Sequence, residues 1–241
     1  MAAPEGRPLS LSLPFTRRLG ASASIPLSSP AVGAYFANLL PDNGHILQSF
    51  QQRHRAPTRS PFDLLAAVSR DCAGAIQLLP ADQSPDDPRS IDALPLDEAG
   101  VAQVLRDATL GPNSGATSSD AFRLSIAGAQ EKTALTRWKG RWCRPHGATP
   151  TTHILKLPLG LIGGMKLDMT HSVENEWLCA MVLKAFGLPV AACQPLQFED
   201  MKALVVERFD RAWWTSPEGD QRLIRLPQED LCQATGAPPD A

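Results

Sequence analysis

Short apolar segments separated by prolines make up most of the first third of the chain. Residues 9–15 alternate apolar and polar side chains, a period that predicts a β-strand, and the apolar segment 75–79 predicts another short strand. A Ser-Pro pair opens residues 29–40, and another opens residues 60–68. Serine caps free backbone N–H groups and proline fits the first helical position, so we expect a helix after each pair.

A polar, proline-rich segment at residues 80–95 has the composition of a linker. The apolar spacing at about 97–107 then predicts a helix, and a second segment rich in turn-forming residues follows at 111–115. We therefore expect two domains, at residues 1–105 and 115–241.

The second domain is rich in strand-like segments. These lie at residues 123–126, 132–138, 141–143, 153–157 and 203–209. One helix is well marked, because apolar side chains recur at helical spacing from Ser172, the expected N-cap, to Gly187, which ends it. The predicted fold class is α+β, with an N-terminal α/β subdomain followed by an antiparallel sheet and one prominent helix.

Composition and charge narrow the class of protein. The 241 residues carry 23 Lys and Arg against 25 Asp and Glu, a net charge of −2, which excludes a strongly basic nucleic-acid coat. No apolar run approaches the ~18 residues of a membrane span, so we expect no membrane association. The five cysteines form no Cys-x-x-Cys pair, which indicates neither a zinc site nor a disulfide framework and favours a cytoplasmic location.

Residues 128–133, Gly-Ala-Gln-Glu-Lys-Thr, suggest a phosphate-binding loop. A P-loop NTPase needs two glycines and a following helix, but Ile126 and Glu131 occupy the glycine positions and strand-like sequence follows. A protein kinase instead places a glycine-rich turn between two strands. It binds the phosphates with a lysine on a later strand, and a helix glutamate holds that lysine.

Lys156 fits the kinase arrangement, because it lies on a predicted strand about 25 residues after the loop and the next helix carries Glu176. Glu174 is a competing partner, although the helix dipole alone favours an acidic residue in the first turn. A lone strand lysine is more often a solvated edge residue. The loop, the lysine and the glutamate in this order favour the kinase-like interpretation.

Five segments extend this comparison, at residues 125–133, 147–158, 172–176, 206–211 and 225–230. In this order they resemble the motifs of the HipA-type serine/threonine kinases, which are the toxins of bacterial toxin–antitoxin pairs. Segments 38–42 and 61–65 match the N-terminal subdomain of the family. The resemblance implies an accessory N-terminal subdomain followed by a protein-kinase-like N-lobe with one αC-like helix.

The resemblance also implies roles for individual residues. The nucleotide loop would comprise Ile126, Ala127, Gly128, Ala129, Gln130, Glu131 and Lys132. Ser125 would be the regulatory autophosphorylation site, where a phosphate adds about −1.5 to −2 charge beside an anion-binding loop. Lys156, with Glu176 as its helix partner, would contact the phosphates of ATP.

Glu207 and Phe209 would border the adenine at the hinge, and Asp210 would reach the ribose or neighbouring polar groups. ATP and Mg²⁺ are the implied cofactors. The family's catalytic Asp-Gly-His-x-x-Asn segment and a later magnesium-binding aspartate do not occur before Ala241. We therefore expect no catalytic or metal-binding residue here, a missing catalytic lobe and no kinase activity from this chain alone, whether through a frameshift, a split gene or an isolated fragment.

The partners are implied by the resemblance alone. They are a HipB-like DNA-binding antitoxin and, as the substrate, an aminoacyl-tRNA synthetase whose phosphorylation arrests translation. Direct nucleic-acid binding by this chain is not expected. The alternative is a non-catalytic interaction module that binds an antitoxin or a separately encoded kinase lobe, because apolar surface left uncovered favours association.

Overall fold

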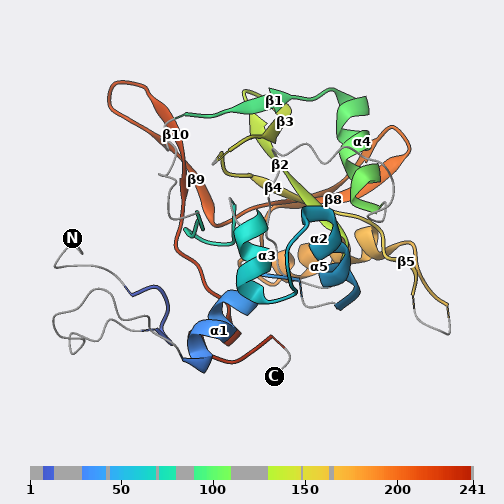
Figure 1. The fold of residues 1–241 in the computed structure, drawn as a ribbon. Helices are drawn as coiled ribbons and strands as arrows, with labels where there is room; N and C mark the ends of the chain where they lie inside the picture. The colour runs from blue at the N-terminus through green and yellow to red at the C-terminus, as the bar shows by residue number, and fades with distance from the viewer. Residues whose placement is uncertain are drawn as a thin grey trace.

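The computed structural model describes residues 8–13, 29–41, 44–68, 71–79, 90–109, 130–147, 149–162 and 166–239. Figure 1 shows a group of helices from the N-terminal part of the chain lying below a layer of β-strands. The chain returns to these helices at its end, so the two termini of the described region lie on the same side of the molecule (Figure 1).

The N-terminal group consists of three helices, α1 (Pro30–Ala37), α2 (Gly44–His54) and α3 (Pro61–Val68). Ser29 caps α1 as predicted, because its side chain accepts a hydrogen bond from the backbone N–H of Val32. Buried apolar side chains of α3 and of the segments after α1, α2 and α3 form a small core: Leu39, Leu40, Ala56, Leu64, Leu65 and Cys72.

Six antiparallel strands form the main sheet, in the order β1-β3-β2-β4-β8-β7. Their bounds are β1 (Ala93–Pro95), β2 (Lys132–Trp138), β3 (Arg141–Pro145), β4 (His153–Lys156), β7 (Cys193–Phe198) and β8 (Met201–Glu207). The predicted hairpin is present, since Lys139 and Gly140 adopt positive φ and turn β2 into β3. The pairing confirms an antiparallel sheet.

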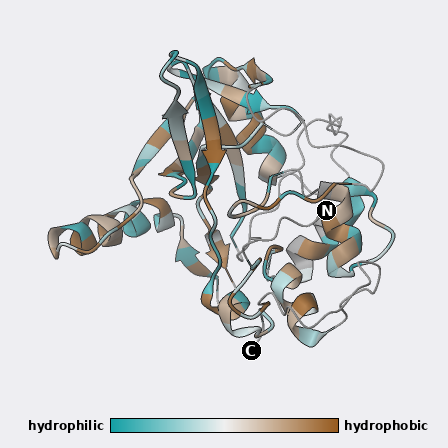
Figure 2. Ribbon diagram, turned by 90° about the vertical axis from the view of Figure 1, so that its left-hand side faces the viewer, coloured by the Kyte–Doolittle hydropathy of each residue, from teal (hydrophilic) through white to brown (hydrophobic). Residues whose placement is uncertain are grey.

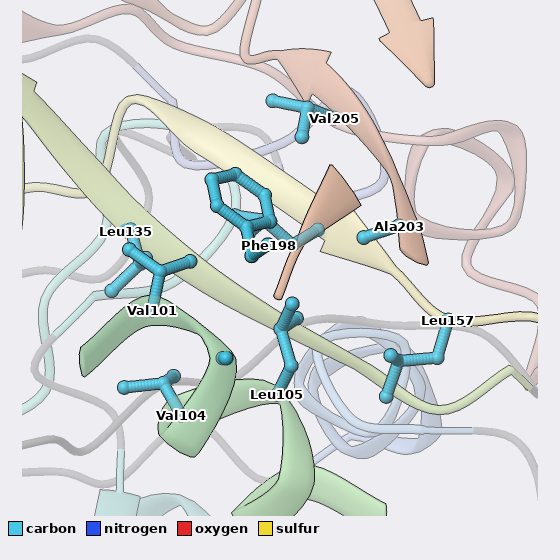
Figure 3. Packing of buried hydrophobic residues seen from close by; sticks show 10 residues of the cluster. Val101, Val104, Leu105, Leu135, Leu157, Phe198, Ala203 and Val205 are labelled. Atoms are coloured by element: carbon cyan, nitrogen blue, oxygen red, sulfur yellow. The ribbon is translucent and has the colours of Figure 1, made fainter. Parts of the chain in front are cut away.

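Helix α4 (Glu98–Thr109) covers one face of this sheet. Val101, Val104 and Leu105 recur at helical spacing, so they share the face that packs on Leu135 and Phe198 of the strands (Figure 3). The core also contains Ala102, Leu155, Leu157, Ala203 and Val205. The sequence predicts this helix. The expected first domain, residues 1–105, includes most of α4 and the residues of β1, whereas both elements pack with the sheet.

The remaining elements are shorter strands and two further helices. They are β5 (Gly160–Ile162), β6 (Leu167–Met169), α5 (Ser172–Ala185), β9 (Arg211–Thr215), β10 (Gln221–Arg225) and α6 (Leu231–Thr235). Strands β5 and β6 form one hairpin, and β9 and β10 form another. In Figure 2, α5 projects from the body at the left, and only Ser172 and Val173 at its start are buried.

The C-terminal helix α6 joins the N-terminal helices. Asp230 and Gln233 form a capping box at its start. The amide of Gln233 donates to the carbonyl oxygen of Tyr35 at 3.1 Å, and its own carbonyl accepts from the hydroxyl of Ser10 at 3.1 Å. Gly236 ends the helix in the left-handed conformation, as helix C-termini commonly do.

Three local predictions differ from the structure. Residues 9–13 form a turn closed by an isolated Ser10–Leu13 bridge, because the serine hydroxyls bond to α6 instead of lying along a strand. Residues 75–79 lie outside helices and strands. Ser172 is the first helical residue of α5, and its hydroxyl accepts from the N–H of Leu159 at 3.0 Å, so it does not cap the helix.

Within the described ranges, no helix is long and apolar enough to cross a membrane.

Candidate functional site

Lys156 is the last residue of β4, an interior strand of the sheet between β2 and β8. Successive side chains of a strand point to opposite faces. Leu155 enters the core beneath α4, so Lys156 points to the other face of the sheet. There its Nζ donates a hydrogen bond to Oε1 of Glu176 on α5. The Lys156 side chain remains 27% exposed, which leaves its charge accessible to an anionic ligand.

Glu174 has a different partner. Its Oε1 accepts a hydrogen bond from Nζ of Lys202 on β8, and His171 Nδ1 lies 3.9 Å from its Oε2. The hydrogen bond from Lys202 is the main cause that lowers the pKa of Glu174. Two Lys–Glu pairs therefore join α5 to the sheet, and Glu176 rather than Glu174 faces Lys156.

The predicted nucleotide loop lies partly outside the described residues. The residues that lie outside the described ranges are Ser125, Ile126, Ala127, Gly128 and Ala129. The structure describes the end of the loop, where Gln130 Nε2 donates to the carbonyl oxygen of Leu157 at 2.6 Å.

The backbone also ties the loop end to β4, because the N–H of Leu157 donates to the carbonyl oxygen of Glu131 at 3.2 Å. Lys132 then lies opposite Lys156 in the register of β2 and β4. Residues 130–132 are thus held at the end of β4 that carries Lys156. Because Lys132 begins a strand and not a helix, the P-loop alternative is wrong.

The hinge residues lie at the other end of the same strands. Glu207, the last residue of β8, is paired with His153 at the start of β4, and its N–H donates to the carbonyl oxygen of Ala192 at 2.8 Å. The three residue steps from His153 to Lys156 span about 10 Å along the strand. Phe209 follows β8 and is 70% exposed, so its ring is accessible.

Asp210 does not lie on this open surface. Its Oδ2 accepts from Arg208 Nη2 at 2.7 Å, from Arg211 Nη1 at 2.9 Å and from the N–H of Gly74 at 2.7 Å. Its Oδ1 accepts from Arg208 Nε at 2.9 Å. Both oxygens are engaged inside the protein, and the residue is 4% exposed. Of the two expectations for Asp210, a ribose or neighbouring polar groups, this geometry shows contacts of the second kind.

Asp210 belongs to a buried charge cluster, which we define as Asp71, Arg208, Asp210, Arg211 and Arg225. Burial would raise the pKa of Asp71, but the surrounding arginines, Arg211 first, outweigh burial and lower it. The cluster connects the segment after α3 with the end of β8 and with the β9–β10 hairpin. The family segments 206–211 and 225–230 contain four of its five residues, but nothing in the sequence pattern pairs them with Asp71.

The chemistry of the site suits phosphate groups. A solvent-accessible ammonium on Lys156, held by Glu176, lies beside the end of a glycine-containing loop. Among the described residues, no group of three or more His, Cys, Asp or Glu side chains is placed to hold a metal ion. We therefore assign no magnesium ligands.

Two family models match the chain. Residues 1–79 match the HipA N-terminal domain, and residues 124–241 match the HipA-like C-terminal domain. A protein of Sinorhizobium fredii named "Putative kinase Y4mE" is 35% identical over 97% of this chain and 51% of its own length. The serine/threonine-protein kinase toxin HipA of Shewanella oneidensis is 30% identical over 89% of this chain and 46% of its own length.

The structure is also similar to a solved chain from the complex of Shewanella oneidensis HipA, HipB and operator DNA. The TM-score is 0.68 at 29% identity, over 97% of this chain and 49% of that chain. The protein thus spans about half the length of the relatives it matches. Because both domain models of one family match in the family's order, the chain belongs to the HipA family.

Proposed function

We propose that this chain supplies the nucleotide-binding part of a HipA-type serine/threonine kinase. The observation that carries the proposal is the ion pair between Lys156 on β4 and Glu176 on α5. Protein kinases use a strand lysine in this way, with a helix glutamate holding the ammonium against the phosphates of ATP. In this proposal the sheet and α5 correspond to a kinase N-lobe.

The other site residues act around this pair. Gln130 and Glu131 fix the end of the predicted loop to Leu157, the residue that follows Lys156, which is where the phosphates would bind. Glu207 and Phe209 border the adenine, about 10 Å along the strands from the lysine. A magnesium ion, when bound, would neutralise charge on the phosphates. Ser125 stays a proposed regulatory phosphorylation site.

The proposal can be tested by titrating the 241-residue chain with a fluorescent ATP analogue. Lys156→Ala should weaken binding by about tenfold or more, because a hydrogen bond to a charged group contributes about 1.5–3 kcal/mol. Glu176→Gln should weaken it less, since the ammonium remains but is no longer held.

The second Lys–Glu pair provides a matched control. Lys202→Ala and Glu174→Gln remove equivalent contacts between α5 and the sheet and should leave the affinity within about twofold, because these two side chains bond to each other and not to Lys156. Equal losses from both pairs would contradict the proposal, as would an unaltered chain that fails to bind the analogue.

The partners are part of the proposal. A HipB-like antitoxin is supported by the similar chain's presence in a complex with HipB and operator DNA. An aminoacyl-tRNA synthetase as the substrate rests on the family resemblance alone. Binding of a purified HipB-like protein, measured by size-exclusion chromatography, tests the first of these partners.

A second candidate function is a non-catalytic interaction module. The observation that favours it is the apolar surface of α5, which is unusual for an exposed helix. Its exposed large side chains include Trp177, Leu178, Val182, Leu183 and Phe186, and Phe186 is 79% exposed. The relatives are about twice as long, and a polypeptide equivalent to their other half is the partner that this surface would bind.

Coexpression with such a polypeptide distinguishes the two functions. If the chain is an interaction module, it should form a stable complex with this polypeptide, and the double variant Leu178→Asp with Phe186→Asp should disrupt that complex. The 241-residue chain should then bind no ATP. ATP binding that depends on Lys156, without complex formation, supports the nucleotide-binding function instead.

A further inference from the structure

Two tryptophans from different hairpins stack on each other at the surface. Trp138 ends β2 and Trp213 lies in β9, and their ring centroids are 4.9 Å apart with an interplanar angle of 22°. Trp213 is 42% exposed. Figure 1 shows the β9–β10 hairpin projecting beyond the main sheet, so this stack lies where a second protein can reach it.

Two cationic side chains, Lys139 and Arg141, neighbour Trp138 of this stack. Lys139 Nζ lies 5.3 Å from the ring centroid of Trp138. Arg141 is directly opposite Trp138 in the β2–β3 register, and side chains that are directly opposite point to the same face of a sheet. We call Trp138, Lys139, Arg141 and Trp213 the indole surface.

The charge on the β2–β3 hairpin has one sign. Lys132, Arg137, Lys139, Arg141 and Arg144 are the charged residues between 132 and 145, and no Asp or Glu occurs there. Within the described part of the chain, no carboxylate forms a salt bridge with Lys139 or Arg141. Since the whole chain has a net charge of −2, this cationic density is local.

The carboxylates of the second hairpin, β9–β10, belong to its turn. Glu218 and Asp220 lie between β9 and β10, and Arg222 interacts electrostatically with Glu218. Arg222 also stacks on Trp214, 5.0 Å from the ring centroid, and is therefore not part of the indole surface.

A cationic aromatic surface can bind an acidic protein or a single-stranded nucleic acid, and the ring geometry decides between them. Nucleic-acid bases need free aromatic faces on which to stack. One face of Trp138 is against Trp213 and Lys139 lies over its ring. A protein segment requires only an apolar centre with charges at its rim, which is the arrangement found here.

We propose that the indole surface is a docking site for an acidic segment of a partner protein. Carboxylates of the partner would pair with Lys139 and Arg141, while apolar side chains would cover Trp213. The site is separate from the proposed nucleotide site, because the six residue steps along β2 from Lys132, opposite Lys156, to Trp138 span about 20 Å. Its test is therefore independent of ATP binding.

The test uses a fluorescently labelled polyglutamate peptide and measures its anisotropy with the purified chain at low salt. The unaltered chain should bind the peptide, and affinity should fall as salt rises, because salt screens surface charges. The double variant Lys139→Glu with Arg141→Glu should weaken binding by about tenfold or more, a change of about 1.4 kcal/mol. Trp213→Ala should also weaken it.

Matched variants on α5 and next to β6, outside the two hairpins of the indole surface, serve as controls. Lys166→Glu with Lys184→Glu makes the same change in net charge, and Trp177→Ala removes an exposed indole from α5. Both should leave peptide affinity within about twofold, and circular dichroism should show all variants folded.

Three outcomes would overturn the proposal. The first is that the unaltered chain fails to bind polyglutamate at low salt. The second is that the control pair of charge reversals weakens binding as much as the test pair. The third is that single-stranded oligo-dT binds more tightly than polyglutamate, which would assign the surface to nucleic acid.

Discussion

Arg211 Nη2 donates a hydrogen bond to Oδ1 of Asp71 at 2.9 Å, although 140 residues separate the two along the chain. Both side chains are almost completely buried, with exposed fractions of 2% and 6%. Asp71 follows the N-terminal helices, and Arg211 begins β9. A buried ion pair therefore connects the two parts of the chain that the family models match separately.

Asp71→Asn should lower the free energy of unfolding by about 3–5 kcal/mol, because it removes the buried carboxylate charge that pairs with Arg208, Arg211 and Arg225. Chemical denaturation followed by circular dichroism measures this change. Asp200→Asn provides a control, since Asp200 is 70% exposed in its pair with Arg106 and such pairs contribute at most about 1 kcal/mol. Similar losses from both variants would contradict the assigned role of the cluster.

The buried charge cluster should also make the free energy of unfolding depend on pH in the acidic range. Burial would raise the pKa of Asp71 and of Asp210, but the arginines outweigh it and hold both values below the ordinary range. Their contribution is present above about pH 4, the unfolded pKa, and is lost as the pH falls through the lower folded pKa. Denaturant midpoints measured from neutral pH downwards should show this loss, with a shallower slope in Asp71→Asn.

Tyr35 is the sole tyrosine of the sequence and is fully buried in α1. Burial, with the negative charge of Glu229 as the next cause, raises its pKa to about 12. Tyrosinate absorbance should therefore rise near pH 12 in the folded chain and near pH 10 in the unfolded chain. Stability should be lost as the pH rises from about 10 towards 12, and Tyr35→Phe should remove that loss. A midpoint near 10 in folded protein would refute the assignment.

Gly74 should not tolerate a side chain. Its φ is 70°, and a Cβ there would lie 2.8 Å from the carbonyl oxygen of Gln228. Gly74→Ala should cost at least about 2 kcal/mol of unfolding free energy, because backbone strain and a clash add. Gly140→Ala is the matched control, with φ of 77° and open space around it, and should cost about 1 kcal/mol from strain alone.

The purified 241-residue chain should not phosphorylate serine when it is incubated with ATP and Mg²⁺. The reason is that these residues contain no Asp-Gly-His-x-x-Asn segment, which the family resemblance assigns to catalysis. Phosphoserine measured by mass spectrometry, with a full-length HipA relative as the positive control, decides the point. Phosphate incorporated at Ser125 or at an added protein substrate would show that the chain is active by itself.

Elements with their own periodicity could be predicted, and elements defined by long-range pairing could not. Helix α4 has three apolar side chains on one face, and the β2–β3 hairpin has its turn residues. Strand β7 contains a proline and mixed polarity, so its pairing with β8 decides its conformation. The β9–β10 hairpin is held by Arg211 and Arg225, whose partner Asp71 is too distant in sequence to be inferred.

The sequence by itself determined the family. It also determined that the loop, Lys156 and the helix follow one another along the chain, and that two glutamates of the helix are candidate partners of Lys156. Only the tertiary structure decided between those glutamates, because residues two apart on a helix point about 200° apart. Which of them meets Lys156 depends on how α5 lies against the sheet, and it is Glu176. The same holds for Asp210, whose carboxylate bonds to its neighbours Arg208 and Arg211 and also to the N–H of Gly74, which is 136 residues away in the chain.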